Sequence, residues 1–260
     1  MPASPTFELH GAGVRVADRY LVGPLDMVVA PGRLYGLLGH NGSGKSTLLK
    51  IMARQMPPSE GRLRFEGRPL EAWSARQLAR RVAYLPQQLP VSTGLTVREL
   101  VRLGRYPWHG AIGRFTAADV SQVDEALRLT AVDSLADRFV DTLSGGERQR
   151  AWLAMLVAQD SACMLLDEPI SALDVAHQIE VMDLVRRLCH ERSLTVVTVL
   201  HDVNIAARFC DELIALHRGQ AVAHGTPADV VQPDSLHRIY GVEMGVIQHP
   251  ERGVPVSYVG

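Results

Sequence analysis

The sequence predicts an α/β protein whose main sheet is mostly parallel. Three observations support this fold class: a strand, glycine-rich loop and helix around residue 40, a return of alternating strands and helices from residue 162, and a helix-rich stretch between them. Strands that alternate with helices form parallel sheets, because each crossover returns the chain to the same edge. Functional loops in such sheets follow the carboxyl ends of the strands.

The first third of the chain alternates short apolar runs with turns. Residues 7–9, 25–29 and 63–65 read as strands, and residues 34–38 form the strand before the glycine-rich loop. The helix after that loop covers residues 47–52. Ser74 is placed to cap a short helix through residue 80, which precedes a strand at residues 82–85.

Strand-like runs disappear between residues 89 and 158, where helical periodicity takes over. Thr96 can cap a helix over residues 97–103, and Thr116 can cap a longer one. We interpret residues 89–158 as a helical subdomain inserted into an α/β core of residues 1–88 and 159–260. The 260 residues then form a single domain.

The α/β pattern returns after this stretch. A strand ends at Asp167, a helix at residues 175–191 has Asp174 as its N-cap, and a strand at residues 194–200 leads to a helix at residues 203–209. The C-terminal part predicts a hairpin about residues 218–219 and two short helices near Pro227 and Pro233.

Composition narrows the functional classes. With 27 basic and 28 acidic residues the net charge is −1, so no basic face for nucleic acid is indicated. No apolar run is long enough for a membrane span, and residues 1–5 do not resemble a secretory signal, so we expect a cytoplasmic protein. Cys163, Cys189 and Cys210 are widely spaced and read as reduced, mostly buried thiols rather than a metal site or a disulfide framework.

Residues 39–47 form a complete phosphate-binding loop of the G-x-x-x-x-G-K-[ST] type. Glycine N–H groups and the positive end of the next helix can wrap phosphates. Lys45 would reach the β- and γ-phosphates of ATP, and the Ser46 hydroxyl would bind Mg²⁺. The predicted nucleotide contacts of the loop are Gly39, His40, Asn41, Gly42, Ser43, Gly44, Lys45, Ser46 and Thr47.

Further motifs follow in a characteristic order: the run Leu-Ser-Gly-Gly-Glu-Arg-Gln-Arg at residues 143–150, an apolar strand ending in Asp167-Glu168, and His201 after another apolar strand. With the phosphate loop, they resemble the ATP-binding cassette (ABC) ATPases over essentially the whole chain. The resemblance implies a P-loop NTPase (RecA-like) core, an N-terminal antiparallel β portion and the inserted helical subdomain.

Asp167 is predicted to bind Mg²⁺, directly or through water, and Glu168 to orient or deprotonate the attacking water. The resemblance implies that His201 contacts the γ-phosphate and links the water, Glu168 and a partner subunit. It also implies that Gln87 is a catalytic glutamine that senses Mg²⁺ and water. Gln88 is an alternative to Gln87.

Ser144, Gly145 and Gly146 open a helix whose N–H groups suit a γ-phosphate. Ser144 can equally serve as a helix cap with Glu147, and both roles can hold at once. In the family each ATP lies between the phosphate loop of one chain and the signature motif, here residues 143–150, of another. A head-to-tail dimer with Asp174 near its interface is therefore implied.

Two positions depart from the family pattern: Val16, and Ile170, which stands where threonine is usual next to intact acidic residues and Ser171. Many members place an aromatic residue, which stacks on adenine, where this chain has Val16. Tyr20 is a candidate substitute and is equally explained as a packed strand residue.

A cassette that has no membrane span implies a separate permease, docked around residues 87–109, and an indirect partner that binds the substrate. Residues 84–90, 102–110 and 144–160 resemble the ferric-hydroxamate siderophore import ATPases. Ferric-hydroxamate import at the cytoplasmic face of a bacterial inner membrane is therefore expected, with iron remaining in its chelate. The alternatives are another metal-chelate importer, for ferric catecholate, haem or cobalamin, and a non-transport soluble ABC ATPase.

Overall fold

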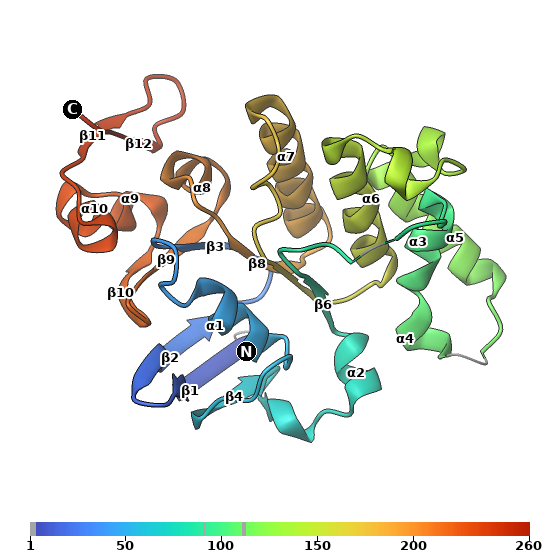
Figure 1. Ribbon diagram of the computed structural model, residues 1–260, viewed down its shortest axis with the longest axis horizontal. Coiled ribbons are helices and arrows are strands. Elements are labelled where there is room, and N and C mark those ends of the chain that lie inside the picture. Colours follow the sequence, from blue (N-terminus) through green and yellow to red (C-terminus); the bar gives the residue numbers. More distant parts are fainter. Residues whose placement is uncertain (1–3, 91, 111–112) are drawn as a thin grey trace.

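The computed structural model describes residues 4–90, 92–110 and 113–260. An antiparallel sheet lies at one side of the molecule, a larger mixed sheet crosses its centre, and a group of helices lies at the other side (Figure 1). This architecture confirms the α/β class. The predictions for residues 1–3, and those parts of residues 89–158 that include residues 91, 111 and 112, lie outside the described ranges.

The N-terminal sheet is antiparallel, as the family resemblance implies, with the strand order β2-β1-β4-β5. One face of its strand at residues 19–29 is exposed to solvent. Leu25, Met27 and Val29 are buried while Asp26 and Val28 are exposed, the alternation of a half-covered strand. The strands are β1 (Phe7–Val16), β2 (Arg19–Val29), β4 (Glu60–Phe65) and β5 (Arg68–Pro69).

The central sheet has the order β10-β9-β3-β8-β7-β6. The pairs among β9, β3, β8, β7 and β6 are parallel, and only the β9–β10 hairpin is antiparallel. The sheet is therefore mostly parallel, as predicted. Its strands are β3 (Leu34–Leu38), β6 (Val82–Leu85), β7 (Cys163–Leu166), β8 (Thr195–Val199), β9 (Glu212–His217) and β10 (Gln220–Gly225).

Helix starts follow the predicted caps. Ser74, Thr96, Thr116, Ser144 and Asp174 each accept a hydrogen bond from the backbone N–H three residues on. The α-helices are α1 (Lys45–Met52), α2 (Ala75–Ala79), α3 (Val97–Leu103), α4 (Tyr106–His109), α5 (Ala117–Leu129), α6 (Gly145–Ala158), α7 (Val175–Glu191), α8 (Val203–Phe209), α9 (Pro227–Val230) and α10 (Pro233–Tyr240). Single 3₁₀ turns lie at Leu70–Ala72, Asp133–Leu135 and Val140–Thr142.

The central sheet is buried on both faces. Tyr35 and Leu37 of β3 face a core shared with α1 and the antiparallel sheet. Leu34 and Leu38 face a second core, which continues through α6 and α7 into the helical group. This packing holds the carboxyl end of β3, and with it the glycine-rich loop, in a fixed position.

The chain ends in a hairpin of β11 (Gly245–Gln248) and β12 (Pro255–Tyr258), which was not predicted. β12 packs against α8. None of the helices in the described residues is long and apolar enough to span a membrane.

Candidate nucleotide site

The glycine-rich loop joins β3 to α1 and is held tightly against neighbouring strands. Gly39 has φ 140° and Gly44 has φ 103°. A Cβ atom on Gly39 would lie 2.2 Å from the Leu216 carbonyl oxygen, and one on Gly44 would lie 2.4 Å from the Leu21 carbonyl oxygen. Both positions therefore require glycine.

Polar groups of the loop surround a cradle that fits a polyphosphate. Lys45 Nζ donates to the carbonyl oxygens of Gly39 (2.7 Å) and His40 (3.0 Å), so the ammonium group lies over the loop. The Ser43 hydroxyl is buried without a partner among the described residues. A bound anion would supply acceptors for these donors. Burial lowers the pKa of Lys45, while the charges of Glu168 and Asp167 oppose that shift.

Asp167 lies beside the start of α1. It follows β7, is 2% exposed, and accepts a hydrogen bond of 2.7 Å from the Ser46 hydroxyl through Oδ1. Burial raises the pKa of Asp167 and the Glu168 charge adds to this, against the hydrogen bond from Ser46. The Ser46 hydroxyl and the Asp167 carboxylate are oxygen ligands, which Mg²⁺ prefers. A bound cation would also offset the cost of burying the negative charge of Asp167.

Glu168, the residue after Asp167, lies in contact with His201. His201 Nε2 lies 2.8 Å from Glu168 Oε1. Glu168 has φ 53°, a left-handed conformation that is costly for a residue with a side chain. The side chain of Glu168 is 12% exposed and that of His201 is 40% exposed, so the pair opens to solvent from one side.

A pocket of about 360 Å³ brings most of the predicted residues together. Gln87, Glu168 and His201 line it opposite the phosphate loop. Leu21, a half-buried residue of β2, was not predicted, because its pattern is that of an ordinary strand residue. The lining residues are Leu21, Asn41, Gly42, Ser43, Gly44, Lys45, Ser46, Thr47, Gln87, Glu168 and His201.

Tyr84 is a second residue that sequence reasoning did not place at the site. Its hydroxyl is buried near Asp167. Burial and then the Asp167 charge raise the pKa of Tyr84 to about 12, so the phenol stays protonated. Tyr84 is the penultimate residue of β6, and the sequence at this position indicates only a strand.

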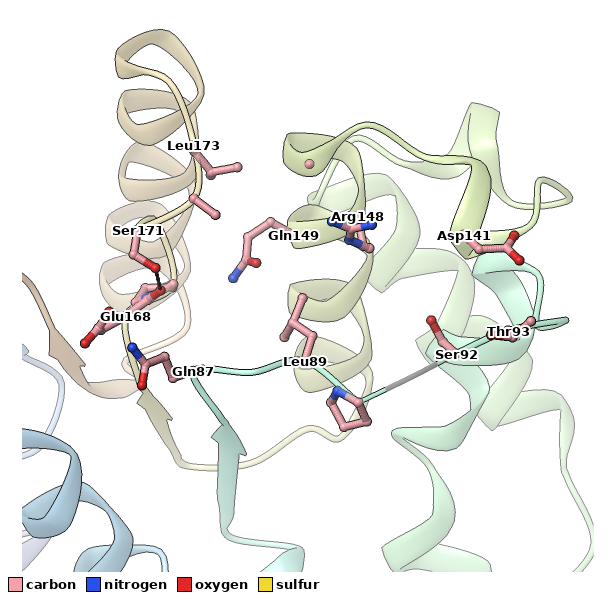
Figure 2. A pocket seen from close by; sticks show the side chains of 14 residues that line it. Gln87, Leu89, Ser92, Thr93, Asp141, Arg148, Gln149, Glu168, Ser171 and Leu173 are labelled. Atoms are coloured by element: carbon pink, nitrogen blue, oxygen red, sulfur yellow. Dashed lines mark hydrogen bonds between the residues drawn. The ribbon is translucent and has the colours of Figure 1, made fainter.

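Ser144, Gly145 and Gly146 lie away from this pocket. Gly145 instead lines a second pocket of about 430 Å³, together with Arg148 and Gln149 of α6. Figure 2 shows the Gln149 side chain extending from α6 toward the segment that carries Glu168, Ser171 and Leu173, with Gln87 beside Glu168. Gln87 and Glu168 line both pockets. The signature residues do not line the 360 Å³ pocket that the phosphate loop borders.

Val16 and Tyr20 lie in the hairpin between β1 and β2. Val16 is 56% exposed and Tyr20 is 38% exposed, with the Arg15 guanidinium 5.6 Å from the tyrosine ring centre. Neither lines the phosphate pocket. Among the described residues that line this pocket there is no phenylalanine, tyrosine or tryptophan that could stack on the base.

Residues 22–171 match the family model of the ABC transporter, which is more than half of the chain. The chain belongs to this family. The matched residues include the phosphate loop, Gln87, the signature and Asp167-Glu168, so the cassette is an ATP-binding ABC ATPase.

Three relatives show which cassettes it is similar to. The ferric enterobactin transport ATP-binding protein FepC of Escherichia coli (strain K12) is 41% identical, over 89% of this chain and 86% of that protein. The iron(3+)-hydroxamate import ATP-binding protein FhuC of Bacillus subtilis (strain 168) is 38% identical (94% and 91%). The hemin import ATP-binding protein HmuV of Bordetella avium is 39% identical (94% and 95%).

Solved structures agree with the fold. A metal-chelate type ABC transporter in an inward-facing conformation matches with a TM-score of 0.85 and 23% identity, over 98% of this chain and 96% of that one. The dimeric bacterial ABC transporter cassette MJ0796 matches with a TM-score of 0.74 and 26% identity, over 85% and 98%.

Proposed function

We propose that this cassette hydrolyses ATP to drive the import of ferric-hydroxamate siderophores through a membrane permease. The observation that carries the ATPase part is that Lys45, Glu168 and His201 line one pocket, with Asp167 hydrogen-bonded to Ser46 of the same pocket. The names of the relatives support the importer part, since they cover ferric siderophore and haem import.

Each residue has a chemical role in this proposal. The phosphate loop binds the triphosphate through its N–H groups and Lys45. Ser46, Asp167 and Gln87 would hold Mg²⁺, which would supply positive charge to the phosphate oxygens. Glu168 accepts a hydrogen bond or proton from the attacking water, and His201 holds Glu168 in place and faces the γ-phosphate.

The second half of the ATP site comes from another copy of the chain. Within one chain the signature residues lie outside the phosphate pocket, while the start of α6 presents the N–H groups of Gly145 and Gly146, which are not used by the Ser144–Glu147 cap. Head-to-tail pairing of two copies would set that helix end against the γ-phosphate. The dimeric structure of the cassette MJ0796 supports the pairing of two copies.

The permease is proposed to dock over the groove around residues 87–109. Gln87 borders this groove and also lines the nucleotide pocket, so a movement of Gln87 can connect the two. Closure of the dimer on ATP would switch the permease between its access states, and hydrolysis would reset it. The cassette would then lie at the cytoplasmic face of a bacterial inner membrane, with a substrate-binding protein on the other side.

Within this proposal residues 89–158 move as a helical subdomain relative to the rest. α6 packs against α3 and α5 inside that segment. Arg150 of α6 forms an ion pair of 3.0 Å with Glu180 of α7, which joins the segment to the core.

The test is uptake of radioactive iron by cells that lack this chain. Iron is presented as hydroxamate, catecholate and citrate chelates, and the wild-type gene or Glu168→Gln is restored. We expect loss confined to hydroxamates and rescue by the wild type alone. Loss confined to catecholates, or normal uptake of all three, would reassign the substrate to a catecholate or to haem or cobalamin.

A further inference from the structure

A second group of metal-ligating side chains lies at the opposite end of the central sheet from the nucleotide pocket. It gathers where α7 ends and β9 begins, beside Leu34 at the start of β3. The Leu34 N–H donates to Asp211 Oδ2 at 2.8 Å, which fixes the carboxylate against the sheet. The phosphate loop follows the other end of this same strand, so the two places are separate.

We propose that Cys189, His190 and Asp211 bind a divalent metal ion of the borderline class, with Zn²⁺ as its representative. One ligand atom from each residue, sulfur, nitrogen and oxygen, lies within 4.8 Å of the other two. His190 Nε2 and Asp211 Oδ2 are 3.1 Å apart. Ligand atoms around Zn²⁺ lie about 3–4 Å from one another, given bonds of about 2.0–2.3 Å.

The ligand set selects the ion. Thiolate and imidazole ligands suit Zn²⁺ and similar ions, whereas Mg²⁺ prefers an all-oxygen shell. The thiolate and the carboxylate together neutralise the two positive charges of the metal. The site therefore differs in chemistry from the oxygen site of Ser46 and Asp167.

The geometry leaves room for a solvent ligand. Cys189 is 0% exposed and forms the inner wall, where its thiol donates to the Leu194 carbonyl oxygen at 3.0 Å. The side chains of His190 and Asp211 are 42% and 27% exposed. Three protein ligands and one water would complete a tetrahedral shell.

Metal binding requires that the Cys189 thiol lose its proton. Burial, and then the Asp211 charge, raise the pKa of the Cys189 thiol to about 12, with Arg186 opposing. The metal forms a bond to sulfur as the thiol proton leaves to solvent. His190 coordinates through the neutral Nε2 and keeps its proton on Nδ1.

The sequence predicted no metal site at the cysteines, because Asp211 follows 21 residues after His190 and no short ligand spacing is present. Cys210 precedes Asp211 but points elsewhere: a Cβ atom on Gly36 would lie 2.9 Å from its sulfur. Cys210 is therefore a matched control. His224, paired with Glu212 at 2.9 Å, is a second control at the same end of the sheet.

The experiment titrates the purified full-length chain with Co²⁺ and follows the near-ultraviolet sulfur-to-cobalt charge-transfer band. This band reports thiolate ligation only, so Co²⁺ at the nucleotide pocket does not contribute. We expect one equivalent per chain, displaced by Zn²⁺. Cys189→Ser should abolish the band, and His190→Ala should weaken binding by more than about tenfold. Cys210→Ser and His224→Ala should leave it unchanged.

A stability measurement covers the possibility that a buried-cysteine variant folds poorly. His190 is exposed, so His190→Ala should fold normally. Zn²⁺ should raise the Tm of the wild type and of Cys210→Ser, but not that of His190→Ala. The proposal is overturned by the lack of a band in the wild type, by a band that survives Cys189→Ser, or by an equal Tm rise in His190→Ala.

Discussion

His201 and Glu168 form a 2.8 Å contact between residues that follow two adjacent parallel strands, β8 and β7. Each residue comes two positions after the last residue of its strand. The order of the strands in the sheet thus places the imidazole beside the carboxylate. In the proposed mechanism this pair acts in hydrolysis, whereas Lys45 and the phosphate loop act in binding.

Removing the imidazole should slow hydrolysis while leaving ATP binding intact. In His201→Ala we expect kcat to fall by about 10²-fold or more, because Glu168 loses its orienting partner. KM should change little, since Lys45 and the loop remain. Steady-state ATPase assays check this, with His224→Ala as the control. A His201→Ala kcat within twofold of wild type would contradict the role.

Two inactive variants should restore each other if the ATP site is shared between copies. Lys45→Ala removes the phosphate contact of one half, and Ser144→Arg blocks the other half. In a mixture, one of the two sites of the heterodimer has both halves intact. We expect ATP hydrolysis to reappear in the mixture and to be absent from each variant alone, measured as phosphate release. No recovery at equal expression would argue against the head-to-tail arrangement.

Restoring an aromatic residue at position 16 should strengthen nucleotide binding. Val16 is 56% exposed. Val16→Tyr offers a ring to adenine, and a stacked aromatic pair contributes about 0.5–1.5 kcal/mol, which is a roughly two- to tenfold tighter Kd. Fluorescent ATP titration measures it. Val28→Tyr, at another exposed position of the same sheet, should have no effect.

The cap of the signature helix should make stability depend on pH. The Ser144 N–H donates to Glu147 at 2.9 Å, and this bond and the one from the Ser144 hydroxyl hold the pKa of Glu147 below its usual 4.5. A lowered folded-state pKa means that the stabilisation is present above about pH 4.5 and is lost as pH falls through the folded value. Glu147→Gln keeps an acceptor but not the charge. Its Tm deficit relative to wild type should therefore shrink as pH falls through this range, and a deficit independent of pH would contradict the assignment.

The C-terminal hairpin should stabilise the start of α8. Asn204 Oδ1 accepts from the Ser257 N–H (2.7 Å) and hydroxyl (3.0 Å), and its amide donates to the Ser257 carbonyl at 3.0 Å. Asn204→Ala leaves the buried Ser257 without these partners, at a cost of about 1–3 kcal/mol in the free energy of unfolding. Urea denaturation measures this. Gln232→Ala, which removes an exposed bond to Ala228, should cost much less.

Local signals in the sequence predicted much of this fold. Capping residues such as Thr96 and Asp174 define helix starts by accepting a hydrogen bond from the backbone N–H three residues later. Because this contact is local, a helix start can be predicted from the sequence. The predicted helix at residues 175–191 agrees with α7. The mixed sheet followed from the strand–helix alternation.

Long-range contacts could not be read in this way. The hairpin of β11 and β12 is held by packing on α8 and by Asn204, and its own residues are mostly polar or exposed. Leu21 and Tyr84 reach the site only because distant strands meet there. The motif order indicated the candidate site residues, whereas the separation of the signature from the phosphate pocket needed the tertiary structure.

The role of Glu168 and the sharing of ATP between two copies are tested together by comparing ATP hydrolysis and molecular mass in the wild type and Glu168→Gln. With Mg²⁺ and ATP, we predict that the wild type turns over, while Glu168→Gln binds ATP, does not hydrolyse it and accumulates as a dimer by light scattering. Wild-type-like turnover in Glu168→Gln, or an ATP-loaded variant that stays monomeric, would contradict the account.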